Sequence, residues 1–159
     1  MLNVLLYGVL LSISLSTLII VMLLRNPRLL LHSYPEDVRA VVAPKTEAEK
    51  RESACWMAVV LSFMIAFPAV AAFVSWKSGG GFLETGGTAF GVVFLFNLTD
   101  WLVLDWLIFC TITPEFAVLP GTAGMSGYKD YGMHFRGFLV GSVLSAALGT
   151  AIGTMVIWI

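Results

Sequence analysis

Residues 2–24, LNVLLYGVLLSISLSTLIIVMLL, form an uncharged and almost wholly apolar run. This run decides the fold, because about 20 consecutive apolar residues let a helix cross the hydrocarbon core of a membrane. Arg25 and Arg28 follow it directly, and no basic segment precedes it. We therefore expect a membrane span here rather than a cleaved signal peptide.

The composition of the whole chain points the same way. Of 159 residues, 58% are hydrophobic and 12% are charged, whereas about 25% of the residues of an average soluble domain are charged. A chain of this length indicates a single domain, 1–159, and a globule of this size cannot hide so much apolar surface. The expected partner is the lipid bilayer. With no basic stripe, no nucleic-acid partner is expected.

Three further apolar runs are long enough to span a membrane: 54–76, 88–112 and 137–159. With 2–24 they predict an all-α, integral membrane four-helix bundle. Thr46 and Glu49 have the spacing of a capping box, so the second helix is expected to begin in water near Glu47. Residues 35–42 are predicted to form a short surface helix, and the glycine-rich segment 78–87 an outer hairpin.

The basic residues predict the orientation. Eight of the nine lie between the first and second or between the third and fourth runs, and only Lys77 lies on the other side. Positive residues favour the cytoplasmic side of a membrane. We therefore expect an N-out/C-out protein of a bacterial inner (plasma) membrane, with cytoplasmic loops over 25–53 and 113–136. The eight residues are Arg25, Arg28, Arg39, Lys45, Lys50, Arg51, Lys129 and Arg136.

The fourth run carries a small residue at every fourth position. Such a register places small side chains on one helix face, where another backbone can approach closely. We expect this face to pack against residues 2–24 of the same chain; the alternative is a partner subunit, giving a homo-oligomer through the fourth helix. The residues are Gly137, Gly141, Ser145, Gly149 and Gly153.

The third run contains the segment 96–111, FNLTDWLVLDWLIFCT, with two acidic residues. On an α-helix Asn97, Asp100 and Asp105 fall within a sector of about 140°. A carboxylate at mid-membrane depth is costly unless it faces a cavity or a partner, so we predict that these residues bind a proton, an ion or a substrate. Two alternatives stay open. If the span is shifted, Asp105 lies at the inner membrane–water interface. In the second alternative, Asp100 only hydrogen-bonds a Ser or Thr of a neighbouring helix and so holds the two helices together.

Reactive side chains also occur in the second long loop, 113–136. Glu115, Asp130 and His134, together with Asp105, are candidate catalytic residues near the inner leaflet, with His134 as a general base. The alternative is that the basic residues of this loop only set the topology and that His134 is merely exposed. No motif of the sequence indicates a cofactor or a metal site.

The segment FNLTD, residues 96–100, resembles the FNxAD motif of the lipoprotein signal peptidases, which are also four-helix membrane proteins. It has Thr where that family has Ala, and the family's second motif, GNxxDR, does not occur. The aspartic dyad that the family implies is therefore not expected. Three function classes remain: ion- or proton-linked transport or permeation through the third helix, which we favour, a membrane enzyme acting on a lipid or amphiphile, and a non-catalytic assembly subunit.

Overall fold

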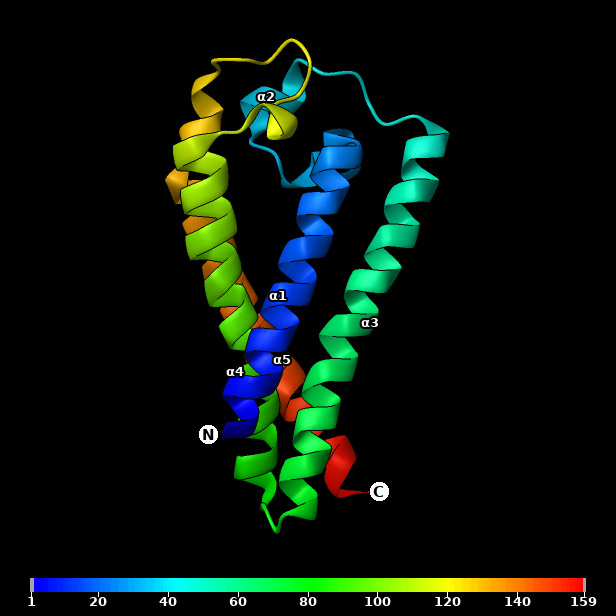
Figure 1. The fold of residues 1–159 in the computed structure, drawn as a ribbon, viewed down its shortest axis with the longest axis vertical. Helices are drawn as coiled ribbons and strands as arrows, with labels where there is room; N and C mark the ends of the chain where they lie inside the picture. Colours follow the sequence, from blue (N-terminus) through cyan, green and yellow to red (C-terminus); the bar gives the residue numbers. More distant parts are fainter. Residues whose placement is uncertain (1, 159) are drawn as a thin grey trace.

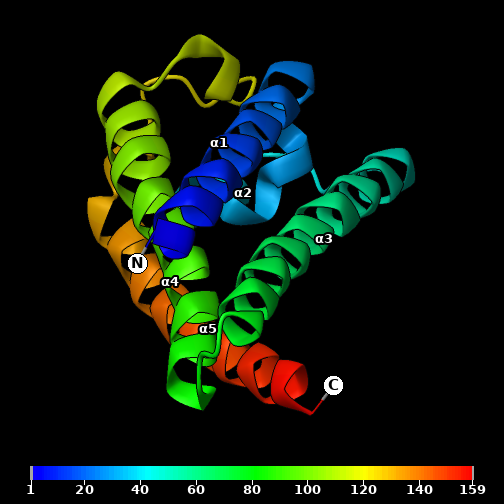
Figure 2. The same cartoon turned by 60° about the horizontal axis from the view of Figure 1, so that its bottom comes forward.

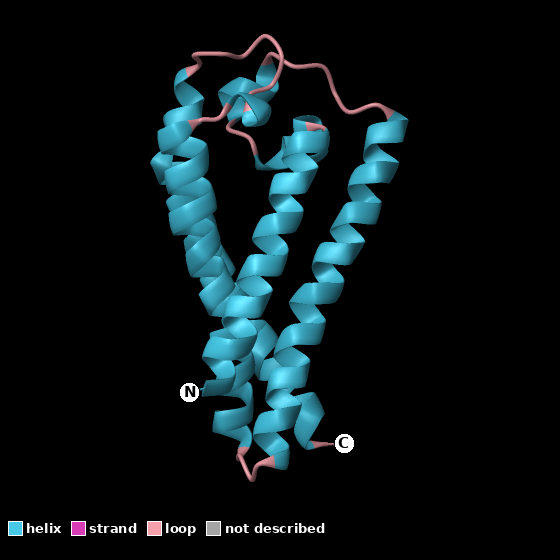
Figure 3. Ribbon diagram, in the orientation of Figure 1, coloured by secondary structure: helices cyan, strands magenta, loops and turns pink. Residues whose placement is uncertain are grey.

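The computed structural model describes residues 2–158, and every regular element in that range is a helix. The long helices are α1 (Leu2–Arg25), α3 (Glu47–Lys77), α4 (Phe82–Thr99), which continues directly into η2 (Asp100–Ile112), and α5 (Tyr131–Ile157) (Figure 3). In this range four helices, with α4 and η2 counted as one, are long and apolar enough to cross a membrane. The prediction of an all-α chain with four long apolar helices is thus confirmed.

The third helix begins earlier than the predicted span. It starts at Phe82, which reduces the expected hairpin to a turn over residues 78–81. Gly86 does not interrupt the helix, because the helix packs there against α5. A Cβ atom placed on Gly86 would lie 3.3 Å from the carbonyl oxygen of Gly149. Gly86 therefore allows close packing rather than a loop, whereas a Cβ atom placed on Gly87 would meet nothing within 4 Å.

The ends of the other helices have identifiable caps. The capping box predicted at the start of α3 is present: Thr46 Oγ1 accepts from the backbone amide of Glu49 at 3.2 Å, and the Glu49 carboxylate accepts from the amide of Thr46 at 2.8 Å. The last helix begins at Tyr131, before the predicted residue 137, because the Asp130 carboxylate accepts from the amide of Met133 at 2.8 Å. A side chain that satisfies a free amide in this way stabilises a helix start.

The long helices converge at one end of the molecule and diverge at the other (Figure 1). The end with the turn 78–81, near which both termini lie, is called the hairpin end. The opposite end, with segments 26–46 and 113–130, is called the loop end. The turned view in Figure 2 also shows α3 standing apart from α1 toward the loop end.

Small side chains pack the hairpin end. A Cβ atom on Gly149 would lie 2.8 Å from the Phe90 backbone, and one on Gly153 would lie 2.7 Å from Gly86 Cα. Next to this contact, Ala72, Ala89, Ile152 and Val156 form a buried cluster. The small-residue face of α5 therefore packs against α4 of the same chain, and not against residues 2–24 as expected.

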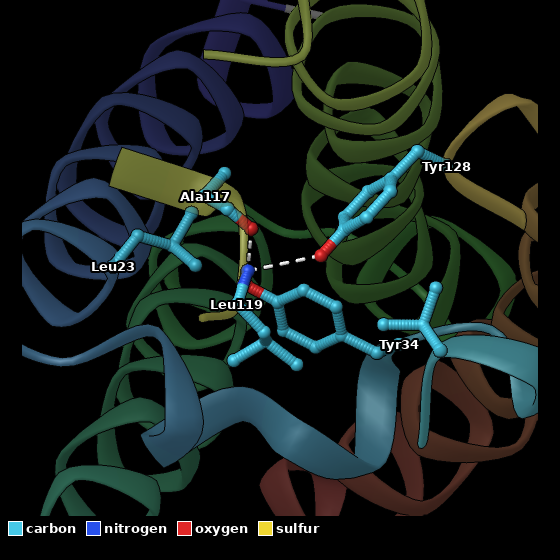
Figure 4. Packing of buried hydrophobic residues seen from close by; sticks show 6 residues of the cluster. Leu23, Tyr34, Ala117, Leu119 and Tyr128 are labelled. Atoms are coloured by element: carbon cyan, nitrogen blue, oxygen red, sulfur yellow. Dashed lines mark hydrogen bonds between the residues drawn. The ribbon is translucent and has the colours of Figure 1, made fainter. Parts of the chain in front are cut away.

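A cap built from both long connections packs at the loop end (Figure 4). Tyr34, buried in this cap, donates from its hydroxyl to the carbonyl of Ala117 at 2.8 Å, and the amide of Leu119 donates to the Tyr128 hydroxyl at 2.9 Å. Burial first, and then the nearby Tyr128, raise the pKa of Tyr34, so it acts as a neutral donor. The cap cluster is Leu23, Tyr34, Val38, Ala117, Leu119 and Tyr128.

The connections themselves contain short helices. Residues 26–46 include η1 (Pro27–Ser33) and α2 (Glu36–Ala40), where the surface helix over 35–42 was predicted. Residues 113–130 include η3 (Glu115–Ala117) and η4 (Ser126–Lys129). The amide of Gly127 in η4 donates to the Asp37 carboxylate in α2 at 3.0 Å. This contact and the shared core fix α2 over the end of the bundle.

Candidate functional site

The third long helix changes its winding at Asp100. From Asp100 to Ile112 the backbone forms a π-helix, in which each amide bonds to the carbonyl five residues earlier. The end of the segment shows this spacing, since the amide of Thr113 donates to the carbonyl of Ile108 at 2.8 Å. The Trp101 and Trp106 rings, also five residues apart, have centroids 4.7 Å apart. Residues at this spacing therefore come to lie beside each other.

This winding brings the two aspartates together. On an α-helix, Asp100 and Asp105 would be separated by about 140° around the axis. On η2 both line the same cavities. The sequence carried a signal that the α-helical reading missed: residues 100–104, DWLVL, are followed by residues 105–109, DWLIF, a repeat with a period of five.

The end of η2 is fixed by a lysine. The Lys129 ammonium donates to the backbone carbonyl of Cys110, to that of Thr111 at 3.1 Å and to the Thr113 hydroxyl at 2.9 Å. Thr113 itself has φ 50 and ends the helix in the left-handed region. A cation at the C-terminus of a helix satisfies carbonyls that have no partner within the helix. Lys129 thus holds the C-terminal end of η2 in place near the start of α5.

An acid and a base meet between η2 and α5. His134 Nδ1 lies 3.0 Å from Asp105 Oδ1, and the imidazole is only 7% exposed. The ring edge packs against Phe109, with centroids 5.5 Å apart. The second ring nitrogen, Nε2, is buried without a hydrogen-bond partner. Such an unpaired nitrogen is unusual, because buried polar atoms are nearly always paired.

Two adjoining cavities surround this pair. The polar cavity has a volume of about 380 Å³, and its lining includes His32, Arg39, Asn97 and Trp101. The apolar cavity has a volume of about 140 Å³ and is lined mainly by aliphatic side chains of α1 and η2. The two share five lining residues, so they meet at the acid–base pair. The shared residues are Ser33, Tyr34, Asp100, Asp105 and His134.

Trp101 supplies a second unpaired polar atom at the polar cavity. Its indole nitrogen Nε1 is buried without a partner. The ring is held by stacking on Phe138, with centroids 4.4 Å apart and planes at 20°. An indole N–H is a donor only. Trp101 and His134, which both line the polar cavity, thus each carry a buried nitrogen without a hydrogen-bond partner in the protein.

Asn97 lies in the wall of the polar cavity and also holds α4 to α5. Its Nδ2 donates to the Phe138 carbonyl and to the Ser142 hydroxyl, both at 3.1 Å. Its side-chain oxygen lies so close to Gly141 that a Cβ atom there would collide with it. Among the small residues of α5, Gly141 thus faces Asn97, Ser145 is buried, and Gly149 and Gly153 contact α4.

The structure gathers some of the predicted site residues and separates others. Asn97, Asp100, Asp105 and His134 line one cavity. Glu115 is exposed in η3, and Asp130 caps α5 and borders a different hollow, with Asp37. Gly137, predicted to be a packing residue, lines the polar cavity, and no atom lies within 4 Å of a Cβ placed there.

Four residues that line the polar cavity come from a loop that the sequence did not predict to be part of the site. They belong to the first long connection, and only the cap described above brings it over η2 and α5. No spacing within the sequence announces this placement. The residues are His32, Ser33, Tyr34 and Arg39.

Within residues 2–158, no three His, Cys, Asp or Glu side chains converge in a geometry that would hold a metal ion. The groups that the cavity does offer are two carboxyls, one imidazole with an unpaired nitrogen, an indole donor and a guanidinium. Comparison with known proteins gives no relative: no protein-family model, no curated protein and no solved structure matches the chain.

Proposed function

We propose that the protein is a membrane enzyme that carries out general acid–base chemistry on a lipid or another amphiphile at the cytoplasmic leaflet. The observation that carries this proposal is the pair of Asp105 and His134, 3.0 Å apart, which lines two cavities and in which His134 Nε2 is buried without a partner. The orientation, N-out/C-out with the loop end in the cytoplasm, is supported by the eight basic residues at that end.

The chemistry follows from the separation of the two side chains. An ionised Asp105 carboxylate beside Nδ1 favours a proton on that nitrogen, and the neutral ring then keeps a lone pair on Nε2. His134 takes a proton from a bound hydroxyl, an activated C–H group or a water molecule, and returns it later in the cycle. Asp105 orients the ring and stabilises the imidazolium, and Asp100 is a second carboxyl in the same cavity.

The position of the cavities favours chemistry from one side over permeation. Both adjoin the loop end, since Ser33 and Tyr34 of the first connection line both of them. Toward the hairpin end, Gly149 and Gly153 bring α5 into backbone contact with α4. A substrate that enters from the loop end therefore meets the acid–base pair before it meets a packed core.

The test is turnover in a lipid environment. The purified protein is placed in nanodiscs made from a bacterial lipid extract, and the lipids are compared by mass spectrometry before and after incubation. We expect one amphiphile to be converted, and His134→Gln to slow that conversion by about 10²–10⁴-fold. The control is Arg51→Gln, an exposed position on α3. Conversion at the parent rate by His134→Gln would refute the proposal.

Proton-linked transport is the second candidate. It is favoured by Asn97, Asp100 and Asp105 lining one cavity with His134, since titratable groups within a membrane span commonly form proton relays. It requires the hairpin end to open in another conformation, or a homo-oligomer through α5 to supply the path. Liposomes with an internal pH dye test it: transport predicts a proton flux that Asp100→Asn abolishes, and the enzyme predicts none.

A further inference from the structure

We infer that the ligand of this site is a single-chain amphiphile with an anionic head, a phosphate or a carboxylate. Its head is bound by Arg39 in the polar cavity, and its chain lies in the apolar cavity. This inference rests on the proposed function, because it names the class of substrate on which the acid–base pair acts.

Arg39 is a positioned cation without an acidic partner. Four ion pairs occur among residues 2–158, and none of them includes Arg39. Its helix, α2, is anchored by the buried Val38 and by the contact of Asp37 with Gly127. The guanidinium borders the polar cavity, where both aspartates are more than 4.0 Å away. The side chain itself is exposed, and its planar guanidinium suits the bidentate binding of a phosphate or carboxylate.

The other basic residues nearby do not add a second free charge. Burial, and then the positive charges of Lys45 and Arg39, lower the pKa of His32, so at neutral pH it offers one N–H donor. The Lys45 ammonium is already bonded to the Leu29 carbonyl at 2.6 Å and to the Ser53 hydroxyl at 2.9 Å. Besides the two carboxyls, the cavity therefore presents one cation, more than 4.0 Å from either of them, together with neutral donors, and this cation can bind one anionic head group.

The apolar cavity provides for the rest of the molecule. Ile19 and Ile20 of α1 face Leu104 and Ile108 of η2 across it, and its volume is about 140 Å³. This small size suits the first few carbons of one hydrocarbon chain and leaves no room for a second chain. Because the two cavities meet at the acid–base pair, a ligand that fills both places the group next to its head beside His134.

Binding of three probes to the protein in nanodiscs tests the inference. The probes are oleoyl lysophosphatidic acid, monoolein, which has the same chain and a neutral head, and glycerol 3-phosphate, which is the head alone. We expect lysophosphatidic acid to bind at least about tenfold more tightly than either of the others. Arg39→Gln should remove this preference and leave monoolein binding unchanged. Arg51→Gln, which lies away from the cavity, should change neither.

Filling the apolar cavity with a larger side chain tests whether this cavity binds the hydrocarbon chain of the ligand. Leu104→Trp should weaken the binding of both lipids by about tenfold or more, and Ile20→Phe is the second variant if the first does not fold. If glycerol 3-phosphate binds as well as lysophosphatidic acid, the ligand is a soluble phosphate compound and not an amphiphile. If monoolein binds equally well, or Arg39→Gln has no effect, the guanidinium only balances the charge of the aspartates. Each of these results overturns the inference.

Because binding is measured without turnover, this test separates the inference from the proposed function. Tight, Arg39-dependent binding with no conversion of any lipid would leave the inference standing and remove the enzyme. Conversion of lipids regardless of their head charge would do the opposite.

Discussion

The two ends of the bundle are built from different side chains, and they differ accordingly in what they can do. At the hairpin end, Gly86, Gly149 and Gly153 let α4 and α5 touch backbone to backbone. Toward the loop end, the contact between η2, which continues α4, and α5 is made instead by the large rings of Trp101 and Phe138. Helices that approach closely leave no space between them, whereas helices held apart by large rings leave room for a cavity.

The two ends also differ in the chemical groups that they hold. In the described chain, the acid–base pair and the unpaired nitrogens of Trp101 and His134 lie at the loop end. The hairpin end holds buried alanines and aliphatic residues instead. The packing at the hairpin end therefore fixes the positions of the helices that carry these groups at the loop end. Four substitutions can break or sharpen this division.

Asp105→Asn should have the largest effect, and on activity rather than on stability. The amide keeps the shape of the side chain but cannot hold the His134 ring with a proton on Nδ1 and a free Nε2. Turnover in nanodiscs should fall by about 10²–10⁴-fold, while the melting temperature in detergent changes little. A variant that retains full turnover would show that the pair only packs the two helices.

Gly149→Leu should have the largest effect on stability. The added side chain meets the Phe90 backbone, 2.8 Å from the position of its Cβ, and overpacking of this kind typically costs about 1–3 kcal/mol. The control is Val143→Leu on the same helix, where the side chain is 71% exposed. If thermal melts in detergent show the same stability for both variants, the hairpin end is not the packed end.

Lys129→Met should loosen the π-helix by removing the ammonium that caps the carbonyls of Cys110 and Thr111. We expect a loss of about 1 kcal/mol, the ordinary magnitude for such a bond at a partly exposed position. Lys50→Met, which breaks only an exposed pair with Glu47, is the matched control. Hydrogen exchange of the η2 amides should rise in Lys129→Met alone. Unchanged exchange would mean that the π-helix is maintained without this cap.

Substitution of His32 should have the smallest effect on stability, and this effect should depend on pH. Its pKa in the folded chain lies below the ordinary value of 6.5, because burial and the charges of Lys45 and Arg39 disfavour the imidazolium. The unfolded chain therefore binds the proton first, so this group reduces stability as the pH falls through 6.5. His32→Asn should gain melting temperature relative to the parent at about pH 5 and match it at about pH 7.5. A constant difference at all pH values would contradict this.

Much of the scaffold was predictable from periodicity and composition. The four apolar runs and the capping box at Thr46 depend on local sequence, and local sequence suffices to predict them. The π-helical winding of η2 was not predicted, because the apolar run 88–112 was expected to form an α-helix that includes Asp100 and Asp105. The five-residue repeat that begins at Asp100 was the available clue.

The candidate site was only half predictable, for a physical reason. Asp105 and His134 are reactive residue types in or beside predicted helices, so they stand out in the sequence. Arg39 reaches the cavity through the cap, in which Tyr34 bonds to Ala117 across 83 positions of the chain. Contacts over such separations depend on how two irregular segments fold together, and no local pattern encodes that.

Nitrogen NMR of the two histidine rings tests the central claim most directly. The chain has only two histidines, so the protein labelled with ¹⁵N-histidine gives two sets of ring signals, and His134→Gln identifies which set belongs to His134. At neutral pH we predict that His134 has a protonated Nδ1 and a bare Nε2, and that Asp105→Asn removes this preference. A His134 ring that is protonated on both nitrogens, or whose bare nitrogen is Nδ1, would contradict the account.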